Sequence, residues 1–148
     1  MPSRSSFLAL ALAAVLAVTA AGCSGPEPVD LFLVQRTGSI AGAKLTLRFI
    51  DDGGVSCNGG PRKEITSSQL ITARELRREL DGQDDDHPGL ASKHINLKPG
   101  SISTLSYNVR SEKGTVVFSD TSPHQPQTFY KLALLTRQVA QGACGLAR

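Results

Sequence analysis

Tryptophan is absent from the sequence, and the only aromatic rings besides histidine are five phenylalanines and two tyrosines. So few rings argue against a site that stacks sugars or nucleic-acid bases on aromatic surfaces. A large excess of one charge is also missing, because sixteen basic side chains against thirteen acidic ones leave a formal net charge of +3. A balance this close to neutral does not indicate a nucleic-acid partner.

Sequence motifs for several chemistries are missing as well. The three cysteines are far apart and form no Cys-x-x-Cys pair, which argues against a redox role. There is no Gly-x-Ser-x-Gly turn to present a nucleophilic serine. Gly53-Gly54 and Gly59-Gly60 lack the spacing and the helix start of a phosphate-binding loop. We therefore predict no catalytic residue, no cofactor and no metal site.

The N-terminal segment carries the strongest positive signal. Residues 7–20 are a stretch of fourteen residues without a charge, and Arg4 precedes it. This stretch is shorter than the roughly 20 residues of a permanent transmembrane helix, and it has the length of the apolar region of a secretory signal peptide. A buried N-terminal helix is the alternative, but the stretch has no polar face. We expect residues 1–22 to be a signal peptide that is removed.

The residues at the end of this stretch are Ala20-Ala21-Gly22-Cys23. They resemble the lipobox of bacterial lipoproteins, although Leu is commoner than Ala at the first position. In that family the cysteine thiol receives a diacylglycerol, and cleavage makes the cysteine the new N-terminus. A competing interpretation is ordinary cleavage after Ala20, which would leave Cys23 as a free thiol.

The number of cysteines favours lipidation. An exported protein rarely keeps an odd free thiol, and this sequence has three cysteines: Cys23, Cys57 and Cys144. If Cys23 carries the lipid, Cys57 and Cys144 remain as one disulfide pair. Two acyl chains hold a protein stably at a membrane. Residues 23–29 then form the lipidated N-terminus and a short tether that is rich in Pro and Gly.

This interpretation predicts a lipid-anchored protein at the cell membrane that faces away from the cytoplasm. The membrane is then its first partner, and a second protein of the cell envelope is a possible further partner. The sequence does not indicate an oligomeric state.

Residues 30–148 have the length of one domain. In its first half, Asp30–Arg36 is an apolar run that predicts a strand buried on both faces. Residues 44–50 alternate between apolar and polar side chains, turn at 51–54 and return at 55–57, which predicts a hairpin. Residues 58–63 are expected to be a connection.

A helix is predicted over Ser67–Asp81. Thr66 and Gln69 have the spacing of a capping box, and Ile65 and Leu70 have that of a hydrophobic staple. The helix has one apolar stripe and a Gly directly after its last residue, which favours an end there. The stripe consists of Leu70, Ala73, Leu76 and Leu80.

The second half repeats this pattern. Residues 83–100 read as a long polar connection, residues 104–110 and 115–119 as a second hairpin, and residues 127–141 as a second helix. We therefore predict an α+β domain of two layers, in which two helices cover one face of an antiparallel sheet of about four to five strands. The disulfide closes a loop of nearly ninety residues, which the chain-entropy model values at roughly 4–5 kcal/mol.

Three groups of residues are weak candidates for a site. His87, His94 and His124 lie in predicted loops, and the acidic run at 84–86 lacks the alternating spacing of a calcium loop. A basic patch near the first helix could meet anionic lipid headgroups, or it could be an exposed face that Glu75 and Glu79 neutralise. The residues of this patch are Arg62, Lys63, Arg74, Arg77 and Arg78.

Several segments of the exported part are similar to a group of small lipoproteins from actinobacteria. The residues that carry the likeness are Asp30–Gly38, Cys57–Gly60, Ser119–Thr121 and Ala143–Gly145. These segments provide turns and the two cysteines, so the resemblance supports the export route and the Cys57–Cys144 pairing but implies no activity.

Two hypotheses about function remain. The first is a non-enzymatic binding or interaction module at the cell envelope. The second is a small hydrolase or a ligand carrier with a site in the loops 83–100 and 120–127, which requires a histidine and a carboxylate in one concave pocket.

Overall fold

The computed structural model describes residues 29–146. The predicted signal peptide, Cys23 and most of the tether lie outside the described residues. In chain order, the elements of these residues are β1 (Asp30–Gly38), β2 (Leu45–Ile50), β3 (Gly54–Cys57), β4 (Arg62–Glu64), α1 (Ser67–Asp81), the 3-10 helix η1 (Ala91–Lys93), β5 (Leu105–Ser111), β6 (Gly114–Ser119) and α2 (Gln127–Gln141).

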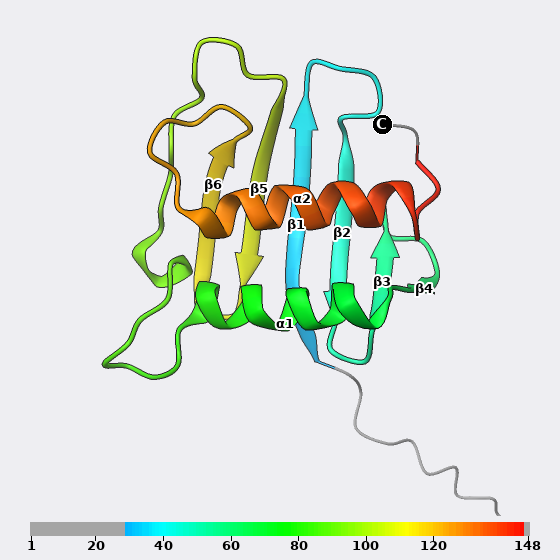
Figure 1. Ribbon diagram of the computed structural model, residues 1–148, viewed down its shortest axis with the longest axis horizontal. Helices are drawn as coiled ribbons and strands as arrows, with labels where there is room; N and C mark the ends of the chain where they lie inside the picture. The colour runs from blue at the N-terminus through cyan, green and yellow to red at the C-terminus, as the bar shows by residue number, and fades with distance from the viewer. Residues whose placement is uncertain (1–28, 147–148) are drawn as a thin grey trace, which may run out of the picture.

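The strands form one antiparallel sheet in the order β4-β3-β2-β1-β5-β6. The first strand is central, because it pairs with β2 on one side and with β5 on the other and so joins the two predicted hairpins. Helices α1 and α2 lie side by side and cross the strands on one face (Figure 1). The predicted α+β class with two layers is confirmed.

The sheet has six strands rather than four or five. The additional strand is β4, which begins inside the segment expected to be a connection. Its three residues, Arg62, Lys63 and Glu64, are all exposed. A strand at the edge of a sheet needs no apolar side chains, and charged ones are common there. Its sequence therefore carries no alternation by which it could be recognised.

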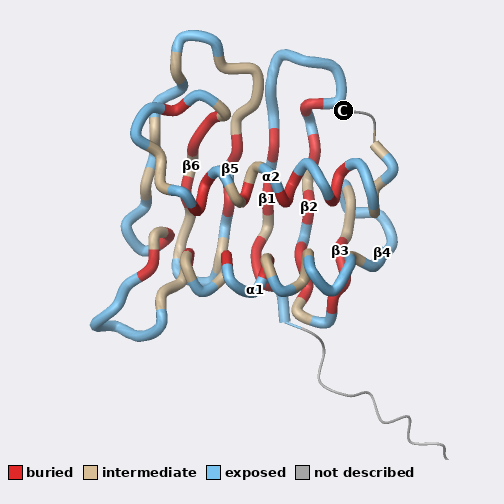
Figure 2. Tube along the Cα trace, in the orientation of Figure 1, coloured by how far each residue is buried: buried red, intermediate tan, exposed pale blue. Residues whose placement is uncertain are grey.

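The core lies between the sheet and the two helices, and both layers contribute buried residues to it (red in Figure 2). The sheet contributes β-branched and aromatic residues such as Phe49, Val109 and Phe118, each no more than 1 % exposed. Among residues 29–146, no helix or strand covers the opposite face. For this reason β1 is not buried on both faces as predicted: Gln35 is exposed and Leu33 is only half-buried.

Helix α1 has its predicted bounds, and the predicted capping box at its start is confirmed. The Thr66 hydroxyl accepts a hydrogen bond from the backbone N–H of Gln69, and the Gln69 side chain accepts one from the N–H of Thr66. The helix ends before Gly82, whose φ of 81° favours glycine. A Cβ at Gly82 would lie 2.3 Å from the carbonyl oxygen of His87, so a larger residue is excluded there.

Helix α2 also has its predicted bounds, and its buried stripe includes Phe129, Leu132 and Val139. Cys144, three residues beyond the helix, forms a disulfide with Cys57 of β3. The two Cα atoms are 5.9 Å apart and 87 residues apart in the chain. The predicted disulfide is confirmed, and it ties the end of α2 to the sheet.

The long connection between α1 and β5 is more ordered than its polar sequence indicates. After η1, residues 95–97 run beside β6 in a parallel arrangement. The N–H of Leu97 donates to the carbonyl of Val117, and the N–H of Val117 donates to the carbonyl of Ile95, both at 2.8 Å. This segment therefore covers the outer edge of β6.

Candidate functional site

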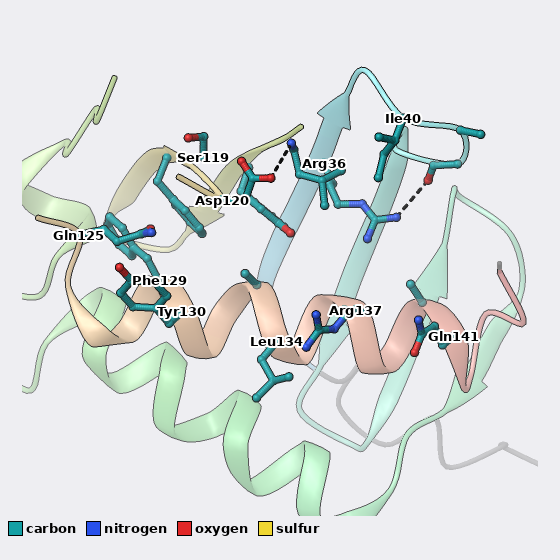
Figure 3. A pocket seen from close by; sticks show the side chains of 17 residues that line it. Arg36, Ile40, Ser119, Asp120, Gln125, Phe129, Tyr130, Leu134, Arg137 and Gln141 are labelled. Carbon is teal, nitrogen blue, oxygen red and sulfur yellow. Dashed lines mark hydrogen bonds between the residues drawn. The ribbon is translucent and has the colours of Figure 1, made fainter. Parts of the chain in front are cut away.

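The two helices leave part of the sheet uncovered. Helix α2 crosses the strands near the middle, so the ends of β1, β5 and β6 extend past it (Figure 1). Between α2, these strand ends and the β1–β2 loop lies a groove of about 710 Å³ (Figure 3). This volume falls in the range of small-molecule sites, roughly 300–1,000 Å³.

The groove is lined mainly by apolar side chains. Leu105 and Phe118 come from the sheet, and Ala133 comes from α2. Its rim contains Ile40, Tyr130 and Leu134, which are 45 %, 50 % and 45 % exposed. These three are half of the six large apolar side chains that are exposed in residues 29–146. Such a concentration of exposed apolar surface marks an interaction site rather than ordinary surface.

Arg36 lies at the sheet side of this groove and is only 6 % exposed. Its side chain is on the same face of β1 as Phe32 and Val34, which belong to the core. Nε donates to the carbonyl of Ala43 and a terminal nitrogen donates to the carbonyl of Gly42, both at 3.0 Å. Within residues 29–146, no carboxylate lies within 4.0 Å of this guanidinium.

Tyr107 is also buried in the groove, with 3 % of its surface exposed. Its ring stacks on Phe118 at 5.0 Å, and Phe118 stacks on Phe129 at 4.5 Å. Burial raises the pKa of the Tyr107 hydroxyl; the charge of Asp120 adds to this effect, and Arg36 and Arg137 oppose it. The hydroxyl is therefore neutral at physiological pH, and the charged groups of the groove surround it.

Asp120 is the carboxylate of the groove, and its own chain satisfies it. It accepts hydrogen bonds from the hydroxyls of Ser103 and Thr104 and from the backbone N–H groups of Thr104 and Leu105, at 2.6 to 3.2 Å. Burial alone would raise the pKa of Asp120, but these hydrogen bonds outweigh it, and the pKa is lowered. Asp120 thus fixes the start of β5 and has no cation within 4.0 Å among the described residues.

A second hollow, of about 620 Å³, lies on the open face of the sheet. Leu33 forms part of it and pairs in register with Arg48 on one side and Arg110 on the other. Arg48 forms an ion pair with Asp30 at 3.4 Å. Arg48 and Arg110 are both exposed, so this hollow contains no buried charge comparable to Arg36, and we favour the groove.

The residues of the predicted histidine site do not come together in the groove. None of the three histidines lines it, and all three are exposed. The Nδ1 atom of His87 is 2.9 Å from Asp84 within its own loop. His94 and His124 have positive φ values of 48° and 55°, which are typical of turn positions. In the part of the chain that the structure describes, no group of three potential metal ligands is present.

Most of the predicted basic patch is paired with carboxylates. Arg74 lies 2.6 Å from Asp51, and Arg62 lies 3.2 Å from Asp52. The hydrogen bond from Arg62 lowers the pKa of Asp52. Arg77 is similarly paired with Asp81 and Glu112. These pairs leave little free positive charge beside α1.

Comparison with protein-family models, with curated proteins and with solved structures found no match. Over residues 29–146, no helix is both long and apolar enough to cross a membrane.

The predicted loop 120–127 contributes Asp120 and Gln125 to the groove, whereas the loop 83–100 contributes nothing. Sequence reasoning missed Arg36, Tyr107 and Arg137, which also line the groove. One signal was present: Arg36 is charged, yet the alternation of β1 places it on the side of Phe32 and Val34. A charged residue that the alternation of a strand places on the core side is rare, and it therefore indicates a functional site.

Proposed function

We propose that the chain is a non-enzymatic binding module, anchored by a lipid outside the cytoplasm, that uses the groove beside α2 as its binding site. The observation that carries the proposal is the coincidence of exposed apolar side chains and buried, unpaired positive charge in one cavity. The apolar rim provides binding energy, and the charge provides selectivity.

The anchor part of the proposal rests on the sequence. The apolar stretch over 7–20, the small residues before Cys23 and the odd number of cysteines have a single explanation in lipidation. With Cys57 and Cys144 joined in a disulfide, Cys23 is the only cysteine left for this role.

The groove favours binding over hydrolysis. A hydrolytic site needs a nucleophile, a base beside it and a group that orients the base. Tyr107 remains protonated, and the four hydrogen-bond donors around Asp120 occupy its oxygens. Neither side chain is therefore a suitable base.

Substitution of the cysteine tests the anchor. We expect the wild-type chain to incorporate labelled palmitate and to sediment with membranes. The Cys23→Ala chain, which keeps the alternative cleavage position after Ala20, is expected to lack the label and to appear in the soluble exported fraction. Cys57→Ser serves as the control and should keep its label. Equal labelling of wild type and Cys23→Ala would contradict lipidation at Cys23.

An uncharged apolar fluorophore tests the groove. We expect N-phenylnaphthylamine to bind to the exported Cys23→Ala chain, and the added change Leu134→Glu to weaken this binding by about tenfold or more, because it places a charge on the apolar rim. Ile71→Glu is the matched control, since Ile71 is an exposed apolar residue on α1 outside the groove. Equal effects of the two changes would contradict the groove as the site.

A further inference from the structure

We infer that the groove binds a single-chain amphiphile with an anionic head, and that Arg36 and Arg137 hold the head. This inference rests on the proposed function and names the class of its ligand. Three features carry it: an unpaired buried charge, a second cation beside it, and an apolar channel that extends away from both.

The first feature is the environment of Arg36. A buried arginine is costly unless an anion accompanies it, because backbone carbonyls provide hydrogen bonds but no opposite charge. Arg36 uses Nε and one terminal nitrogen on the carbonyls of Ala43 and Gly42. Five N–H groups are available on a guanidinium, so donors remain for a ligand. An anionic ligand in the groove would give Arg36 the adjacent negative charge that it lacks among residues 29–146.

The second feature is the position of Arg137. Arg137 is an exposed residue of α2, the helix that forms one wall of the groove, whereas Arg36 belongs to the sheet (Figure 3). Tyr107 lines the same groove, and the charge of each arginine opposes the rise in the pKa of its hydroxyl. Asp120 stays ionised, because hydrogen bonds from uncharged donors lower its pKa, and it therefore offsets one of these two charges. The two arginines and this one carboxylate leave the lining of the groove with a net charge of +1. An excess of positive charge carried by guanidinium groups of two elements suits a carboxylate or phosphate head.

The third feature is the shape of the apolar lining. From Arg137 the groove extends along α2 back to Phe129, which corresponds to about 12 Å at the rise of an α-helix. Ala133 and Leu134 lie between these ends on the helix, opposite Leu105 and Phe118 of the sheet. A narrow apolar strip of this length fits an extended hydrocarbon chain, and each methylene buried contributes about 0.8 kcal/mol.

The groove also opens at the end of the domain away from the tether. Strand β1 begins at Asp30, directly after the tether, and reaches Arg36 about 20 Å further along. A ligand therefore enters at the end of the domain far from the point at which the chain is attached. This position leaves the groove accessible while the protein is anchored.

Four ligands with the same decyl chain test the inference: decanoate, decyl phosphate, decanol and decyltrimethylammonium. Each is used to displace N-phenylnaphthylamine from the exported Cys23→Ala chain. We expect at least one of the two anions to displace the fluorophore at about tenfold lower concentration than decanol, and the cation to be the weakest. The better of the two anions identifies the head as a carboxylate or a phosphate. Equal potency of decanol and both anions would overturn the inference.

Arginine variants connect this selectivity to the two side chains. Arg137→Gln is expected to reduce the advantage of the anions over decanol several-fold and to leave decanol unchanged. Arg78→Gln, the same change at an exposed position of α1, should alter neither. Arg36→Lys keeps one charge but loses the planar fork, and we expect it to reduce the advantage further. An unchanged advantage in Arg137→Gln would overturn the assignment even where Arg36→Lys does not fold.

The experiments distinguish failure of the groove as a binding site from failure of the anionic amphiphile as its ligand. If the fluorophore binds and Leu134→Glu removes it, but the anions have no advantage, the groove is a site for a different ligand. If the fluorophore does not bind, or if Leu134→Glu has no more effect than Ile71→Glu, the proposed function fails together with the inference.

Discussion

The two helices have the same length but are held in place in different ways. Helix α1 begins with a capping box made by its own residues and buries one narrow stripe that includes Ala73, Leu76 and Leu80. Helix α2 follows Pro126 without a side-chain cap, yet it buries seven residues. The comparison shows that local hydrogen bonds define α1, whereas packing and the disulfide hold α2. The proposed binding site belongs to the second kind, because α2 forms a wall of the groove.

Glu79 joins the two helices. It accepts hydrogen bonds from the hydroxyl of Thr128 and from Nζ of Lys131, the latter at 3.0 Å. Burial alone would raise the pKa of Glu79, but these two bonds outweigh it and lower the pKa. Since its side chain is 35 % exposed, solvent screens the pair, and we treat it as a device for alignment rather than a major source of stability.

Among the changes that test this difference between α1 and α2, removal of the disulfide is expected to have the largest effect. Cys57→Ala combined with Cys144→Ala is expected to lower the free energy of unfolding by about 4 kcal/mol, because a closed loop of 87 residues constrains the unfolded chain. We also expect faster hydrogen exchange in the last turn of α2 than in α1. Urea denaturation and exchange measurements check these two results. Equal exchange in both helices would contradict a special dependence of α2 on the disulfide.

Asp120 provides the next test, because it fixes the segment that leads into α2. Asp120→Ala leaves the N–H groups of Thr104 and Leu105 and two hydroxyls without their acceptor, and we expect a loss of about 2 kcal/mol at neutral pH. Asp85→Ala is the control, since Asp85 is exposed in the acidic loop. Urea denaturation measures both losses.

The loss of unfolding free energy in Asp120→Ala should depend on pH. The pKa of Asp120 in the folded protein is below its ordinary value of 3.8, so its stabilisation is complete above that value and disappears as the pH falls through the lower folded pKa. The difference in unfolding free energy between wild type and Asp120→Ala should therefore shrink when measured at about pH 3. A difference that is constant with pH would exclude an ionised Asp120 as its source.

The smallest effect is expected at the start of α1. Thr66→Ala removes the hydroxyl that accepts from Gln69 and should cost about 1 kcal/mol. Hydrogen exchange is expected to increase in the first turn of α1 and to remain unchanged in α2. Thr72→Ala is a suitable control, because Thr72 is in the same helix but does not cap it. Destabilisation of α2 to the same extent would show that the two helices are not held independently.

Much of the fold could be predicted because its signals are local. The capping box at Thr66, the alternation in β2 and the stripe of α2 each determine an element within a few residues. The disulfide was predictable for a different reason, since the proposed lipidation of Cys23 would leave only two other cysteines. Strand β4 could not be predicted, because its position depends on pairing with β3 and not on its own side chains.

The groove depends on information that no single segment contains. Arg36, Tyr107 and Arg137 come from three elements, and only the order of the strands brings them together. Tyr130 and Leu134 look like unremarkable members of an amphipathic helix until the position of α2 on the sheet is known. The cavity exists because α2 covers the middle of the sheet rather than its end, and that outcome is decided by packing.

Both outer edges of the sheet are protected, one by the charged residues of β4 and the other by residues 95–97 along β6. Unprotected edges allow neighbouring chains to pair strand to strand and to aggregate. Copies of a protein confined to a surface meet far more often than copies free in solution. For the lipid-anchored protein that we propose, protected edges would allow a high density on the membrane without strand-to-strand aggregation, while the groove stays open to its ligand.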